Sequence, residues 1–127
     1  MDNVKIPVGH QQVMPYLIID GAAAFLDFIT VVFTAETLSI HHQDDAVLIR
    51  HAEVRIGESC IMFADKNETW PAQTGSLFIY VKNADDTYQL ALENGATSVM
   101  EPADQSYGRS CGITDPAGNT WWITSVL

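Results

Sequence analysis

The chain has 127 residues, of which 47% are apolar, and its 16 acidic and 6 basic residues give a formal net charge of −10. This length predicts a single domain with a buried core, and no apolar run approaches the ~20 residues of a membrane span. The acidic balance argues against binding to nucleic acid or to an anionic membrane, because both attract a positively charged surface. The N-terminus shows no signal-peptide pattern and the 2 cysteines form no CxxC motif, which predicts a cytoplasmic protein.

Five elements are predicted in the first half, in the order strand, helix, strand, strand, strand: residues 12–19, 22–32, 37–40, 47–56 and 59–65. The helix is predicted because Phe25, Ile29 and Val32 recur at helical spacing. The last two strands flank a short hairpin turn at Gly57.

The second half is predicted to repeat this order: residues 76–81, 84–94, 97–100, 109–114 and 119–126. A polar segment with Pro71, residues 66–75, is expected to link the halves. Gly95 is expected to end the second helix, because glycine adopts the left-handed conformation at little cost. Residues 115–118 (DPAG) predict a tight turn before the last strand.

A repeated segment relates the two halves. Residues 16–22 (YLIIDGA) and 78–84 (FIYVKNA) each combine a short apolar run, a turn and the start of a helix. Repeats of this kind indicate the architecture of a chain. The sequence therefore predicts one α+β domain of two pseudo-symmetric βαβββ modules, about 12–65 and about 76–126, that form a curved mixed sheet around a cleft.

Each predicted strand presents alternate side chains to opposite faces, which gives each module a core face and a mixed face. A two-residue turn at Gly57 pairs Arg55 with Cys60. Phe63 and Trp121 fall on the apolar faces and are expected in the core. The mixed faces are expected to line the cleft, and they contain His51, Glu53, Arg55, Cys60 and Met62 in the first module and Ser76, Phe78, Tyr80 and Trp122 in the second.

Several motifs, in their order and spacing, resemble those of a known family: residues 14–17 (MPYL) with 21–22 (GA), 51–59 (HAEVRIGES), 94–96 (NGA) and 115–121 (DPAGNTW). Over residues 13–126 the chain resembles the glyoxalase/bleomycin-resistance/extradiol-dioxygenase superfamily, the vicinal oxygen chelate fold, and in particular its PhnB-like branch. Members include metal-dependent isomerases and dioxygenases, thiol transferases, and metal-free proteins that sequester antibiotics. The resemblance also implies a homodimer, with the cleft either within one chain or built across two chains that exchange halves.

The resemblance implies four metal positions, on the first and fourth strands of each module. These positions correspond to Met14, Met62, Ser76 and Trp122 in this chain. None of them offers the carboxylate or imidazole that a divalent ion prefers. The sequence therefore predicts no metal cofactor, with a divalent metal ion as the alternative.

Other polar residues allow more than one interpretation. His51 and Glu53 share a strand face and could bind a metal, although two ligands are too few for a catalytic zinc site. The favoured interpretation is that His51, Glu53 and Arg55 form a polar stripe joined by hydrogen bonds and an ion pair. Contact of this stripe with a ligand in the cleft is the other interpretation. His51 could also act as a general base. His41 and His42 are adjacent, so on a strand they point to opposite faces. Arg109 could bind an anionic ligand group or pair with one of the many acids.

The sequence thus favours a metal-free protein that binds an apolar or aromatic small molecule in the cleft between the modules, because thioether and aromatic side chains favour such ligands. The alternative is a divalent-metal-dependent lyase, isomerase or dioxygenase of the same superfamily. The predicted cleft residues are Met14, His51, Glu53, Arg55, Met62, Ser76, Phe78, Tyr80, Arg109 and Trp122.

Overall fold

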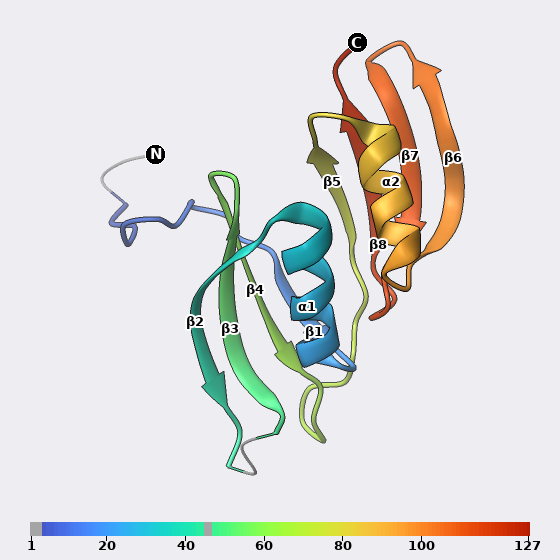
Figure 1. The fold of residues 1–127 in the computed structure, drawn as a ribbon. Coiled ribbons are helices and arrows are strands. Elements are labelled where there is room, and N and C mark those ends of the chain that lie inside the picture. Colours follow the sequence, from blue (N-terminus) through green and yellow to red (C-terminus); the bar gives the residue numbers. More distant parts are fainter. Residues whose placement is uncertain (1–3, 45–46) are drawn as a thin grey trace.

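A computed structural model describes residues 4–44 and 47–127 of the chain (Figure 1). Its elements in order are β1 (Tyr16–Ile19), α1 (Ala22–Phe33), β2 (Glu36–His42), β3 (Ile49–Ile56), β4 (Ser59–Asp65), β5 (Ser76–Tyr80), α2 (Ala84–Glu93), β6 (Thr97–Gln105), β7 (Gly108–Thr114) and β8 (Thr120–Ser125). The predicted α+β fold of two βαβββ modules is confirmed.

The strands form two four-stranded mixed sheets, in the orders β1-β4-β3-β2 and β5-β8-β7-β6. In each sheet the first strand runs parallel to the last strand of its own module, and the other pairs are antiparallel. Within residues 4–44 and 47–127 no strand pair joins the two sheets. The hairpin of β3 and β4 places Arg55 opposite Cys60, as predicted.

Each helix covers one face of its own sheet (Figure 1), and the last strand of the module holds the start of that helix. Gly21 precedes α1 without a side-chain cap, and the backbone N–H groups of Gly21 and Ala22 donate instead to Asp65 Oδ1 at 3.2 and 2.9 Å. In the second module the Ala84 N–H donates to Ser125 Oγ at 3.1 Å. The two modules therefore use equivalent strand ends to anchor their helices.

The core is continuous across both modules. Phe25 packs edge-on against Phe63 within the first module, and Phe33 at the end of α1 contacts Trp121 of the second with ring centroids 4.5 Å apart. Phe63 and Trp121 are both buried, as predicted. The Trp121 indole N–H donates to Asp115 Oδ2 at 2.7 Å, so a buried hydrogen bond fixes the ring at the module junction.

Several predicted element ends are wrong by a few residues. β1 begins at Tyr16 rather than at residue 12, after Pro15, whose nitrogen cannot donate to a strand ladder. β3 begins at Ile49 and not at residue 47, whereas β2 is longer than the predicted 37–40. β6 continues to Gln105 past Pro102, because Pro102 lies on an edge strand within an irregular stretch of the register between Met100 and Ala103.

The linker runs beside the first sheet. The Gln73 N–H donates to the Ile18 carbonyl at 2.9 Å, and the Lys66 N–H donates to the Ile19 carbonyl at 2.8 Å. The Gln73 contact thus uses part of the open edge of β1, whereas the Lys66 contact extends the β1–β4 ladder. None of the helices in the described part of the chain combines the length and apolar character needed to cross a membrane.

Candidate functional site

A pocket of about 730 Å³ lies at the junction of the two modules. The end of α1, the tip of the β3–β4 hairpin and residues Leu77 to Tyr80 of β5 line it. Its apolar walls include Phe33, Ile61, Leu77 and Trp121. This volume lies within the range of about 300–1,000 Å³ that is usual for small-molecule sites.

The open face of the second sheet carries a cluster of aromatic rings, here called the aromatic face: Phe78, Tyr80, Tyr107 and Trp122. The Phe78 ring lies 5.1 Å from that of Tyr80 and 6.4 Å from that of Tyr107, measured between centroids. Trp122 is the direct β-ladder partner of Phe78, so the two side chains lie on the same face. Phe78, Tyr80 and Tyr107 are 51%, 64% and 54% exposed, which leaves large apolar surfaces in contact with solvent.

A glycine makes room for the ring of Trp122. Gly112 pairs with Trp122 across β7 and β8. A β-carbon at Gly112 would lie 2.6 Å from Cζ3 of the indole ring, which is too close for any side chain. The ring therefore occupies the space that a side chain at residue 112 would need.

The open face of the first sheet carries a polar group centred on Glu53. The Glu53 carboxylate accepts hydrogen bonds from His10 Nε2 at 3.0 Å and from His51 Nε2 at 3.2 Å. His51 Nδ1 in turn lies 3.2 Å from the Tyr16 hydroxyl. The hydrogen bond from His10, followed by that from His51, holds the pKa of the Glu53 carboxyl below its usual value.

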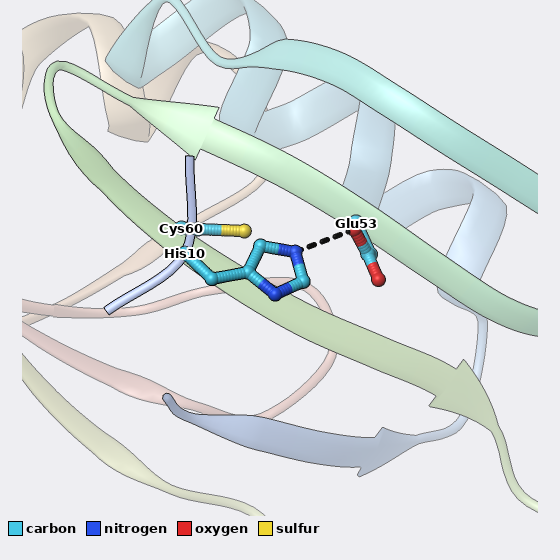
Figure 2. A group of neighbouring side chains, drawn as sticks. All are labelled: His10, Glu53 and Cys60. Atoms are coloured by element: carbon cyan, nitrogen blue, oxygen red, sulfur yellow. Dashed lines mark hydrogen bonds and ion pairs between the residues drawn. The ribbon is translucent and has the colours of Figure 1, made fainter. Parts of the chain in front are cut away.

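The N-terminal segment before β1 reaches this polar group (Figure 2). The side-chain amide of Gln11 pairs with the backbone of Cys60 in both directions, donating to the carbonyl at 2.6 Å and accepting from the N–H at 3.2 Å. The pairing resembles one rung of a β-ladder, so the segment is fixed in register on β4. The Cys60 thiol is buried beneath it, and burial raises the pKa of that thiol.

The predicted cleft residues separate into two groups. His51, Glu53, Arg55 and Met62 lie on the first sheet, with Met14 just before β1, whereas Ser76, Phe78, Tyr80, Arg109 and Trp122 lie on the second. Among the ten, Phe78 and Tyr80 line the junction pocket. The stripe of His51 and Glu53 is confirmed as a hydrogen-bonded pair.

Both arginines of the predicted cleft are held by acids. Arg55 donates to Glu36 at 2.7 Å. Arg109 donates twice to Asp85, at 3.1 Å each, and once to Asp104 at 3.3 Å. These contacts raise the pKa of Arg109 and lower that of Asp85. Of the two roles predicted for Arg109, the structure shows pairing with acids.

Some residues of the site were not predicted from the sequence. His10 and Gln11 belong to an irregular segment with no periodicity, and His10 meets Glu53 across 43 positions of sequence. No spacing rule connects them. Tyr107 is likewise absent from the predicted cleft residues, and it joins the aromatic face through the β6–β7 hairpin.

Comparison with known proteins identifies relatives. Residues 9–123 match the family model described as Glyoxalase/Bleomycin resistance protein/Dioxygenase superfamily. The Uncharacterized protein Mb0911c of Mycobacterium bovis is 33% identical over 120 residues, a match that covers 84% of this chain and 78% of the relative. The sequence resemblance to the superfamily is thereby confirmed.

Solved structures share the fold at low identity. TnmS3, an antibiotic binding protein from Streptomyces sp. CB03234, has a TM-score of 0.71 and 17% identity, over 93% of this chain and 100% of that chain. A PhnB protein from Bacillus cereus has a TM-score of 0.70 and 17% identity, over 91% of this chain and 100% of that chain. At such identity the likeness is one of fold alone.

Proposed function

We propose, since the chain belongs to the glyoxalase/bleomycin resistance protein/dioxygenase superfamily, that it binds an apolar or aromatic small molecule between its modules, without a metal at the superfamily positions. The aromatic face carries this proposal. Three of its four rings, those of Phe78, Tyr80 and Tyr107, are exposed, and such surfaces mark binding sites more often than inert surface. The junction pocket continues this surface, because Phe78 and Tyr80 belong to both.

The chemistry of the aromatic face favours a flat ligand. Aromatic rings stack on planar groups and gain about 0.5–1.5 kcal/mol per pair beyond the burial of their area. Trp122 offers a broad ring for stacking, and the missing side chain at Gly112 leaves room for it. One protein of the same fold, TnmS3, is an antibiotic binding protein, which supports a small-molecule ligand.

The metal positions that the superfamily resemblance implies do not fit a divalent ion. Met14 and Met62 offer thioethers, Ser76 offers a hydroxyl and Trp122 offers an indole, whereas hard and borderline ions favour carboxylate or imidazole. Met62 and Trp122 lie in the fourth strands, as the repeat requires. The proposed binding is therefore metal-independent at these positions.

The proposal includes a homodimer. The aromatic face and the polar face of the first module belong to separate sheets, and a second copy would bring the aromatic face of one chain against an open sheet of the other. Partial burial of Phe78, Tyr80 and Tyr107 around the bound ligand would stabilise such a dimer. Sedimentation equilibrium tests this point, since a monomer at all concentrations contradicts it.

The 2 cysteines are free and buried, which suits a reducing cytoplasm.

A thermal-shift screen of flat aromatic compounds tests the proposed function. At least one compound should raise Tm, with the same Kd in the presence and absence of EDTA. Trp122→Ala should weaken the best compound by about 10-fold or more, as expected for one lost stacking contact. Trp70→Ala is the matched control, because this exposed tryptophan lies in the linker. A screen without binders, or equal losses in the two variants, would reject the proposal.

A further inference from the structure

Three potential metal ligands converge on the open face of the first sheet. His10, Glu53 and Cys60 each offer one ligand atom, and these atoms all lie within 4.8 Å of one another. They come from the N-terminal segment, β3 and β4 respectively. Figure 2 shows the Cys60 sulfur and the His10 ring directed toward the Glu53 carboxylate.

The backbone around the three residues is fixed. The β3–β4 register places Glu53 and Cys60 on one face, because Arg55 is the partner of Cys60 and lies two residues after Glu53. The Gln11 amide holds the neighbouring segment on the backbone of Cys60 through two hydrogen bonds. His10 is thereby placed beside the thiol by a contact that does not involve its own side chain.

We propose that His10 Nε2, Glu53 Oε2 and Cys60 Sγ bind a divalent transition-metal ion of the zinc type, with its fourth position open to water. Zinc bonds of about 2.0–2.3 Å place tetrahedral ligand atoms about 3.3–3.8 Å apart. His10 Nε2 and Glu53 Oε2 are already 3.0 Å apart. The sulfur needs to approach by about 1 Å, which rotation of side chains can supply.

The donor set selects zinc over the hard ions. A thiolate with an imidazole and one carboxylate suits zinc, whereas magnesium and calcium prefer all-oxygen sites. On binding, the ion replaces the proton on His10 Nε2, which moves to Nδ1 of the same ring, the Cys60 thiol releases its proton to solvent, and no atom changes oxidation state. Thiolate and carboxylate together balance the two positive charges.

Neighbouring side chains already orient the ligands. His51 donates to Oε1 of Glu53, the oxygen that does not face His10, and the Tyr16 hydroxyl lies against the other nitrogen of His51. Partners of this kind hold a metal-binding carboxylate in position. Arg55, the ladder partner of Cys60, is paired with Glu36.

This metal site is separate from the four superfamily positions, since none of its ligands occupies Met14, Met62, Ser76 or Trp122. Its main effect is to fasten the segment that precedes β1 to the first sheet. The bound ion should therefore raise Tm, and chelation should release the segment without removing the aromatic face.

The test uses the full chain freed from any affinity tag and stripped of metal. Zinc added in competition with a chromophoric chelator should bind at one ion per chain, and cobalt should give the charge-transfer band of a thiolate ligand. His10→Ala should weaken zinc binding by at least about 100-fold, since loss of even a supporting partner costs 10- to 100-fold. Cys60→Ser should abolish the cobalt band.

Matched controls exist within the chain. His42→Ala removes an exposed histidine of β2, and Cys111→Ser changes the other buried cysteine. Both should keep full zinc binding. Less than one zinc per chain in the wild type, or equal affinity of His10→Ala and His42→Ala, would overturn the proposal. If Cys60→Ser fails to fold, His10→Ala still decides, because His10 lies outside every helix and strand.

Discussion

The indole ring of Trp122 lies against the α-carbon of Gly112, and a β-carbon at residue 112 would come within 2.6 Å of it. The two residues are partners in the β7–β8 ladder. Any side chain at residue 112 must therefore displace the widest ring of the aromatic face.

Gly112→Ala should tilt the Trp122 ring and destabilise the fold by about 1–3 kcal/mol, the usual cost of overpacking. It should also weaken an aromatic ligand found by screening. Urea unfolding and ligand titration measure the two effects. In the Trp122→Ala background the same glycine change should cost almost nothing, because the clash is gone. An equal cost in both backgrounds would show that the ring is not the cause.

Asp115→Ala should lower the free energy of unfolding by about 3 kcal/mol, because it leaves buried donors without an acceptor. Asp115 accepts hydrogen bonds from the Trp121 indole at 2.7 Å and from the Asn119 side chain at 3.2 Å. Chemical denaturation measures the change. Asp27→Ala is the control, since Asp27 is an exposed acid on α1, and a similar loss there would refute the role of the buried network.

Asp65→Ala should destabilise the protein by about 2 kcal/mol and Ser125→Ala by about 1 kcal/mol, within the range for helix caps. Asp65 accepts from Gly21 and Ala22 and also from the Ile49 N–H at 2.8 Å, whereas Ser125 accepts from Ala84. The ranking follows from the number of donors left unpaired. Thermal unfolding of the two variants checks it, and the reverse order would contradict it.

Cys111 should make the protein less stable at alkaline pH. Burial raises the pKa of the Cys111 thiol to about 11, whereas an unfolded cysteine ionises near pH 8.5. Between these values the unfolded chain binds fewer protons, so stability falls as pH rises. Cys111→Ala should show a smaller loss of unfolding free energy from pH 8 to pH 10. Parallel curves for wild type and variant would contradict the assignment.

Hydrophobic periodicity in the helices and alternation in the strands were sufficient to predict the two modules and the buried face of each. Phe25 and Ile29 lie on the buried side of α1, and the Gly57 turn sets the register of β3 and β4 as the spacing predicts. These signals are local, so one chain segment contains them. The end of β6 was missed because Pro102 normally interrupts a strand, and only the edge position of β6 explains its presence.

The candidate site was harder to predict from the sequence because it depends on tertiary contacts. His51 and Glu53 share a strand and could be paired by alternation. His10 and Cys60 join them only once the N-terminal segment is folded back on β4, and the Gln11 contact that does this has no sequence signature. Similarly, the need for glycine at residue 112 can be explained only when Trp122 is known to lie beside it.

The parallel pairing of β1 with β4 has a consequence for the order in which the protein folds. The first sheet is complete only when β1 pairs with β4, which brings Tyr16 beside Met62. The second sheet likewise requires Ser76 to pair with Thr120. Such long-range pairings form late, after the hairpins between them. During synthesis the first module can close while the second is still being made. A nascent chain should therefore already protect β1 from proteolysis once residue 75 has emerged from the ribosome, before the second module is complete.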